Sequence, residues 1–133
     1  MSKPRILVVD DRRSVLWSYY IILKNDAEVV RASSYSEGIE RLREPHLFNG
    51  AIVDLHPHQD GLSGLDIARV ANELYQDIPL FIITGGSTSQ FFSAASQSVR
   101  EHPNIEVILK PFEPYDFQRR ILEKTKAYTP KRK

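Results

Sequence analysis

The sequence predicts an α/β fold in which helices cover both faces of a doubly wound parallel sheet. Four runs dominated by apolar residues have the length and the β-branched content of strands that are buried on both faces. They occupy residues 6–9, 50–53, 80–83 and 105–109. Helical patterns follow these runs, and strands that alternate with helices along a chain favour a parallel sheet. Right-handed crossovers then restrict the topology to a few arrangements.

Composition and charge indicate one globular domain. A chain of 133 residues can bury about two-thirds of its unfolded surface, and 41% hydrophobic with 26% charged residues is unlike disordered or membrane proteins. The formal net charge of +1 gives no overall reason to expect nucleic acid or a membrane as partner. Cysteine is absent, which excludes disulfides, thiolate chemistry and cysteine zinc sites. Neither a signal peptide nor a membrane-spanning run is recognisable, so we expect a cytoplasmic domain.

The first half of the chain carries two predicted helices and one further strand. Residues 14–24 have apolar side chains at helical spacing, and Ser14 is the expected N-cap. Residues 27–31 form a short segment flanked by charge, which is typical of a strand nearer the edge of a sheet. Ser34 and Glu37 have the spacing of a capping box, which predicts that a second helix follows.

Three more helices are predicted in the second half. One opens at Ser63, and one covers about residues 88–99, where a face of serine and glutamine should make it the least stable helix. The last begins near Pro114, because proline is favoured in the first turn of a helix. We therefore expect one domain over residues 1–127 and a short, basic, disordered tail over residues 128–133.

Polar side chains stand at the carboxyl ends of four predicted strands. Asp10 and Asp11 follow the first strand, Asp54 the third, Thr84 the fourth and Lys110 the fifth. Ligands of open parallel sheets bind in the crevice outside these strand ends. We therefore expect the five side chains to converge on one edge of the sheet.

Three carboxylates at one edge of a sheet indicate a site for a cation. Two carboxylates ~5 Å apart repel by roughly 3 kcal/mol at an effective dielectric constant near 20, so either their pKa values rise or a cation binds between them. A hard divalent ion with oxygen ligands and several waters fits best, which indicates Mg²⁺. The ammonium of Lys110 and the hydroxyl of Thr84 complete a pocket for a phosphoryl group carried by an aspartate.

With these residues in this order, the chain resembles a two-component response-regulator receiver domain of the single-domain, CheY-like kind. The resemblance spans essentially the whole chain and rests on Asp10-Asp11, Asp54, Thr84-Gly85 and Lys110-Pro111-Phe112. It implies a flavodoxin-like (βα)5 sheet with strand order 2-1-3-4-5. It also implies a phosphorylation switch in two-component or phosphorelay signal transduction, rather than an enzyme in the usual sense.

The resemblance assigns roles to the acidic residues. Asp54 would accept a phosphoryl group from a phosphohistidine of a sensor histidine kinase or of a histidine phosphotransfer protein. Asp11 and Asp54 would bind Mg²⁺ through their side chains, Asp10 mainly through a water, and His56 through its backbone carbonyl. Magnesium is the cofactor that the resemblance implies, and an intrinsic autophosphatase activity would be the most catalysis expected.

The other motif residues would respond to the phosphoryl group. Lys110 would pair with its oxygens, Thr84 would move to hydrogen-bond one of them, and the Lys110–Pro111 peptide bond would be cis. Val107 departs from the family, which usually has Tyr or Phe three residues before the lysine, a ring that turns inward when the threonine moves. We therefore expect the chemistry at the aspartate to be kept and its readout to differ. The loop over residues 55–62 is also slightly longer than the commonest form.

Two other classes of function stay open at this point. The first is a receiver-like scaffold that binds a protein partner independently of phosphorylation, and Val107 is its support in the sequence. The second is an enzyme on the same fold, such as a phosphatase or a flavoprotein, although no water-activating base beside Asp54 is recognisable. The partners expected for the switch are the kinase or phosphotransfer protein, a downstream protein target and, on phosphorylation, a second copy. Direct contact with nucleic acid or membrane is not expected.

Two local features suggest other ligands. His56 and His58 lie beside the acidic edge and raise the question of a transition metal, but histidines in a polar loop are more often exposed to solvent. The basic residues that close the chain raise the question of nucleic acid, but a short basic tail is more often a solvated end. Both interpretations are therefore disfavoured.

Overall fold

Five parallel strands form one sheet in the order β2-β1-β3-β4-β5, as the resemblance implied. The structure is a computed structural model that describes residues 3–55, 64–85, 97 and 100–133. The strands are β1 (Arg5–Val9), β2 (Glu28–Ala32), β3 (Gly50–Asp54), β4 (Leu80–Thr84) and β5 (Ile105–Leu109). Every residue of β3 and β4 is buried because both faces of the sheet are covered, whereas β2 and β5 form its partly exposed edges.

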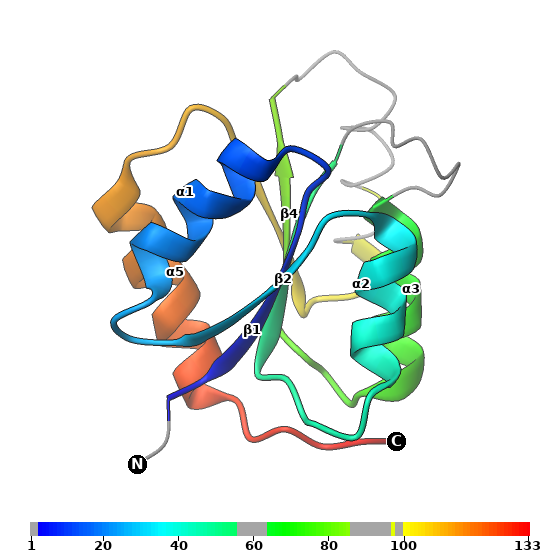
Figure 1. Ribbon diagram of the computed structural model, residues 1–133. Helices are drawn as coiled ribbons and strands as arrows, with labels where there is room; N and C mark the ends of the chain where they lie inside the picture. The colour runs from blue at the N-terminus through cyan, green and yellow to red at the C-terminus, as the bar shows by residue number, and fades with distance from the viewer. Residues whose placement is uncertain (1–2, 56–63, 86–96, 98–99) are drawn as a thin grey trace.

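The described helices pack in pairs on the two faces of the sheet (Figure 1). α1 (Arg13–Leu23) and α5 (Pro114–Ala127) cover one face, and α2 (Tyr35–Arg43) and α3 (Gly64–Leu74) cover the other. The helix predicted over residues 88–99 lies almost entirely outside the described residues. In the part of the chain that the structure describes, no helix is both long enough and apolar enough to cross a membrane.

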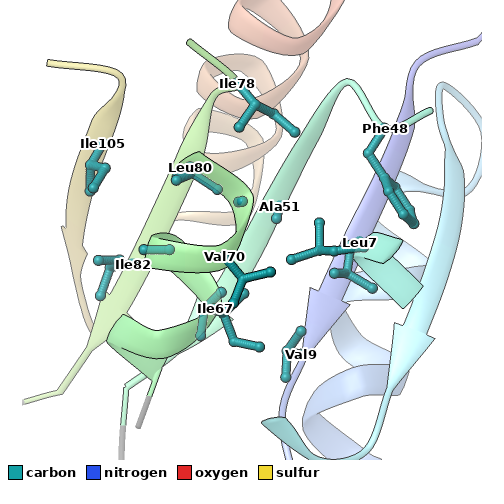
Figure 2. Packing of buried hydrophobic residues seen from close by; sticks show 14 of the residues in the cluster. Leu7, Val9, Phe48, Ala51, Ile67, Val70, Ile78, Leu80, Ile82 and Ile105 are labelled. Carbon is teal, nitrogen blue, oxygen red and sulfur yellow. The ribbon is translucent and has the colours of Figure 1, made fainter. Parts of the chain in front are cut away.

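Alternate side chains of each strand supply two separate apolar cores. Leu7 and Val9 of β1 belong to the core under α2 and α3, whereas Ile6 and Val8 belong to the core under α1 and α5. This alternation is the period of a strand, and it explains why the inner strands are apolar on both faces up to their carboxyl ends. Figure 2 shows the first core, with α3 lying over the sheet.

Local side-chain hydrogen bonds set the starts of α1 and α2. Ser34 accepts a hydrogen bond from the backbone N of Glu37 at 3.1 Å, as the capping box predicts. The prediction that Ser14 caps α1 is wrong, because the helix begins one residue earlier with Arg12 in the N-cap position. Oδ1 of Asp10 accepts a hydrogen bond from the backbone N of Arg12 at 2.8 Å, and this local bond turns the chain into the helix before Ser14.

The basic segment after α5 differs from the disordered tail that we expected, because its backbone is bonded to the end of α3. The Tyr128 hydroxyl donates to the carbonyl oxygen of Gln76 at 2.7 Å. The backbone N of Gln76 donates in turn to the carbonyl oxygen of Lys131 at 2.8 Å, and Lys133 N donates to Leu74 O at 3.0 Å. Figure 1 shows this red segment running from α5 beneath the sheet to the side of α2 and α3.

Arg132 fastens the same segment to α2. Its guanidinium lies 4.8 Å from the ring centroid of Tyr75. Its Nη2 atom donates to the carbonyl oxygen of Leu42 at 3.2 Å and also to that of Glu44. Carbonyl groups in the last turn of a helix lack partners within the helix, so Arg132 satisfies the end of α2.

Candidate functional site

The carboxyl ends of the strands meet at one edge, and backbone hydrogen bonds continue the pairing beyond them. Asp10 N donates to Ala32 O at 3.1 Å, and Lys110 N donates to Thr84 O at 2.9 Å. Thr84 lies opposite Leu109 in the register of β4 and β5. The residues that follow the strands are therefore held by the same ladder as the strands themselves.

Asp54 is the centre of this edge, and three side chains reach its Oδ2 atom. Its side chain is only 3% exposed, and Lys110 Nζ is in direct contact with Oδ2. The Tyr19 hydroxyl donates to Oδ2 at 3.4 Å, and Arg12 Nη2 lies 3.4 Å from it. The Tyr35 hydroxyl donates to the backbone carbonyl of Asp54 at 2.8 Å, so the main chain is fixed as well as the carboxylate.

Arg12 covers the buried carboxylate of Asp10. The backbone N and the Nε atom of Arg12 donate to Asp10 Oδ1 at 2.8 and 3.2 Å, and Nη2 donates to Oδ2 at 3.2 Å. The same Nη2 atom lies 3.4 Å from Oδ2 of Asp54. One guanidinium therefore bridges the two buried carboxylates while its own side chain remains half exposed.

Burial and charge shift the pKa values of these groups in different directions. Burial raises the pKa of Asp54, and the neighbouring Asp10 adds to this effect while Lys110 opposes it. Burial also acts to raise the pKa of Asp10, but the hydrogen bonds and charge of Arg12 outweigh it, so this pKa is lowered. Burial and the nearby carboxylates raise the pKa of the Tyr19 hydroxyl, which therefore stays protonated as a donor.

An aromatic stack ties the residues after Lys110 to the same site. The ring centroids of Phe112 and Phe117 are 4.2 Å apart, and Tyr19 stacks on Phe112 at 6.3 Å. Since the Tyr19 hydroxyl bonds to Asp54, this stack positions one donor of the site from α1 and supports the loop that carries Lys110.

The structure brings together most of the residues that the sequence placed at this edge. Lys110 contacts Asp54, and Arg12 contacts both Asp54 and Asp10. Thr84 is buried at the adjoining strand end, and Asp11 is exposed beside Asp10. The predicted convergence is therefore confirmed for the buried members of the set.

Other predictions at this edge have different outcomes. The Lys110–Pro111 peptide bond is cis, as the resemblance implied. Val107 is partly buried against the core beneath α2 and α3. His56 and His58 lie outside the described residues, so the expected carbonyl ligand is not placed.

A hard cation suits the oxygen donors of this edge, since Mg²⁺ prefers carboxylates and water. Among the described residues, no group of three or more His, Cys, Asp or Glu side chains is arranged to hold a metal ion. Nη2 of Arg12 contacts the carboxylates of both Asp10 and Asp54. Oxygen donors of the kind that Mg²⁺ prefers are therefore present at this edge, and a basic side chain is paired with two of them.

Sequence reasoning missed Arg12, Tyr19 and Tyr35 as members of the site. Tyr19 lies in the helical pattern over residues 14–24, where its ring fills an apolar position and its hydroxyl gives no separate signal. For Arg12 a signal was present, because it directly follows the two aspartates whose repulsion called for a positive charge. For Tyr35 no local signal exists, since its partner Asp54 is 19 residues away in sequence.

Comparisons with known proteins agree on the fold. No protein-family model matches the sequence, and no curated protein matches it. A CheY-like response regulator receiver domain protein from Methanospirillum hungatei JF-1 is 28% identical, with 95% of this chain and 96% of that chain covered and a TM-score of 0.79. A response regulator receiver domain protein from Clostridium thermocellum is 26% identical, with 93% and 95% covered and a TM-score of 0.79. The non-phosphorylated HemR receiver domain from Leptospira biflexa is 30% identical, with 96% and 97% covered and a TM-score of 0.76.

Proposed function

The chain belongs to the family of response-regulator receiver domains, and from this premise we propose that Asp54 is its phosphoacceptor. The donor is a phosphohistidine of a sensor histidine kinase or of a histidine phosphotransfer protein. The observation that carries the proposal is the contact between Lys110 Nζ and Oδ2 of Asp54 at the meeting point of three strand ends. A buried carboxylate with its own ammonium partner is suited to accept a group that brings further negative charge.

The chain's own groups support nucleophilic attack by Asp54. One of its oxygens forms a bond to phosphorus as the phosphorus–nitrogen bond breaks, and the released histidine ring takes up a proton. Lys110 acts to lower the pKa of Asp54 against the effect of burial and then pairs with the phosphoryl oxygens. Tyr35 fixes the backbone carbonyl of Asp54, so the attacking oxygens stay oriented toward the edge of the sheet.

The carboxylates of Asp10, Asp11 and Asp54 would hold Mg²⁺. When bound, this ion neutralises negative charge on the transferred phosphoryl group. Arg12 lowers the pKa of Asp10 and so favours the charged form of this carboxyl. Cation binding and phosphoryl transfer therefore share Asp54 as their common residue.

The readout proposed for this chemistry is a shift between conformations. A phosphoryl group adds about −1.5 to −2 charge to the edge, and the buried hydroxyl of Thr84 at the neighbouring strand end is the donor that it would attract. A ligand or modification that favours one of two states shifts their populations. Val107 replaces the aromatic ring that usually follows this movement, so we propose that a downstream protein reads a different surface here.

Intact mass spectrometry with Mg²⁺ and a small acyl or amido phosphate tests the phosphoacceptor. We expect the parent protein to gain one phosphoryl group and the Asp54→Asn variant to gain none. Asp77→Asn is a matched control, because Asp77 is exposed and its φ of 55° is one that asparagine also adopts. Phosphorylation of Asp54→Asn, or its loss in Asp77→Asn, would contradict the assignment.

Val107 also favours a second candidate, a receiver-like scaffold that binds its partner independently of phosphorylation. In that case neither the parent nor Asp54→Asn gains mass, although Mg²⁺ still binds. Partner capture by the two proteins would then be equal. The same mass experiment therefore separates the two functions.

A further inference from the structure

We propose that Arg12 is an internal competitor of Mg²⁺ at this site, pairing with the carboxylates of Asp10 and Asp54 until a divalent cation displaces it. The inference rests on the proposed function only in taking this edge as the Mg²⁺ site. It concerns the residue that sets how tightly the cation binds, and it does not depend on which protein donates the phosphoryl group.

The first argument is the position of one nitrogen atom. Nη2 of Arg12 lies 3.2 Å from Oδ2 of Asp10 and 3.4 Å from Oδ2 of Asp54. A cation held by Asp54 directly and by Asp10 through a water would draw on the same two carboxylates. A guanidinium has five N–H donors and no acceptor, so it cannot become a ligand of the metal. Arg12 and the metal therefore exclude each other at this position.

The second argument is exposure. The side chains of Asp10 and Asp54 are 0% and 3% exposed, whereas that of Arg12 is 50% exposed. The guanidinium thus forms the solvent side of the buried carboxylate pair. A cation that arrives from solvent meets it first. Because Arg12 is already half in water, its side chain can leave without opening either apolar core.

The third argument is charge. Arg12 and Lys110 bring two positive charges to an edge with three aspartates, and Lys110 is committed to Asp54 by direct contact. If Arg12 stayed in place, a divalent cation would lie beside a second positive group within a few ångströms. Once Arg12 has left, the same cation faces carboxylates that have lost one of their two positive partners among the described residues. Displacement is therefore the arrangement with less repulsion.

One contact can survive the exchange. The backbone N of Arg12 donates to Oδ1 of Asp10 at 2.8 Å, and this bond belongs to the turn that starts α1. The turn therefore keeps Asp10 oriented whether or not the guanidinium of Arg12 contacts the carboxylates. The two side-chain hydrogen bonds to Asp10 and the ion pair with Asp54 break in the exchange.

Calorimetric titration of the full chain with MgCl₂, without any phosphate donor, tests the competition. We expect Arg12→Gln to bind Mg²⁺ about tenfold or more tightly than the parent, since charge-assisted hydrogen bonds no longer have to be broken. Arg12→Lys keeps the positive charge but lacks the planar guanidinium. Its Mg²⁺ affinity should fall between those of Arg12→Gln and the parent. Arg13→Gln removes the same charge from the exposed neighbouring position and should bind Mg²⁺ like the parent.

Thermal unfolding gives a second measurement on the same variants. Without Mg²⁺, Arg12→Gln leaves Asp10 buried without its guanidinium partner, so its Tm should be lower than that of the parent. Added Mg²⁺ should raise the Tm of Arg12→Gln more than that of the parent, because tighter binding to the native state gives greater stabilisation. Arg13→Gln should follow the parent at every Mg²⁺ concentration.

Several results would overturn the inference. Equal Mg²⁺ affinity in Arg12→Gln and the parent would show that the guanidinium does not compete. Weaker binding in Arg12→Gln would show that it assembles the carboxylates instead. Undetectable binding in every variant would mean that no cation site exists here. Because none of these titrations involves phosphorylation, failure of Asp54 to gain a phosphoryl group would leave a measured competition intact.

Discussion

Replacement of Arg132 by methionine tests whether the segment after α5 is part of the folded domain. The side chain satisfies carbonyl groups of Leu42 and Glu44 at the end of α2 and stacks on Tyr75. Methionine keeps an unbranched apolar stem of similar reach but cannot donate a hydrogen bond. The substitution therefore removes the hydrogen bonds and the cation–π contact but keeps most of the apolar stem.

The magnitude follows from these contacts. A hydrogen bond from a charged donor contributes about 1.5–3 kcal/mol when well formed, and a cation–π contact contributes roughly 0.5–1 kcal/mol. Arg132 is only partly buried, so solvent screening reduces the sum. We expect the free energy of unfolding to fall by about 2 kcal/mol. For a domain of this size that corresponds to a decrease in Tm of roughly 8 °C.

Urea unfolding followed by circular dichroism measures the difference. Lys131→Met is the matched control, because it removes one positive charge from the adjacent, exposed side chain and leaves the backbone bonds of Lys131 in place. It should change the free energy of unfolding by less than about 0.5 kcal/mol. If Arg132→Met were as mild as Lys131→Met, the segment would be free in solution, as the sequence first suggested.

Two further predictions concern a buried hydrogen bond and a partly exposed ion pair. Tyr35→Phe leaves the buried backbone carbonyl of Asp54 without its donor at 2.8 Å, so the free energy of unfolding should fall by about 1–3 kcal/mol in urea, whereas the highly exposed Tyr115→Phe should be neutral. Burial acts to raise the pKa of Glu106, but two basic side chains of α5 outweigh it and lower this pKa below 4.5. The ion pairs of Glu106 with these two side chains therefore stabilise the fold above pH 4.5. This stabilisation is lost as the pH falls through the lower pKa of Glu106 in the folded state. Tm should depend less on pH in this range for Glu106→Gln, and an unchanged pH dependence would refute the assignment.

The strands could be predicted because their signal is local. Each inner strand needs apolar side chains on both faces, and such runs are visible without any knowledge of their neighbours. The edge strand β2 was expected over residues 27–31 and is observed at Glu28–Ala32. This small shift arises because an edge strand mixes exposed and buried positions, which weakens the periodic signal.

The docked tail could not be predicted, because its partners are distant in sequence. Arg132 bonds to carbonyl groups 88 and 90 residues away. A run of basic residues at a chain end has the same local composition whether it is solvated or bound. Only the folded arrangement of α2 and α3 supplies the carbonyl oxygens and the ring of Tyr75 that hold it.

The site was predictable to the extent that it depends on strand ends. Asp10, Asp54, Thr84 and Lys110 each follow a recognisable strand, so parallel topology alone brings them to one edge. Arg12 was not predicted, because the direction of a side chain at a helix start depends on the turn before it. Repulsion between the aspartates was correctly recognised. The nearest positive charge that offsets it is that of Arg12, which directly follows Asp11 in the chain.

The two basic residues of the edge are held in different ways, and this difference assigns them different roles. Lys110 is fixed by the ladder bond of its backbone N to Thr84 and is 29% exposed. Arg12 stands at the start of a helix and is 50% exposed. A charge that must remain with Asp54 throughout phosphoryl transfer belongs on the fixed side chain. A charge that must release its carboxylate partners to an incoming cation belongs on the exposed side chain, since the departure of that side chain disturbs neither the sheet nor the cores.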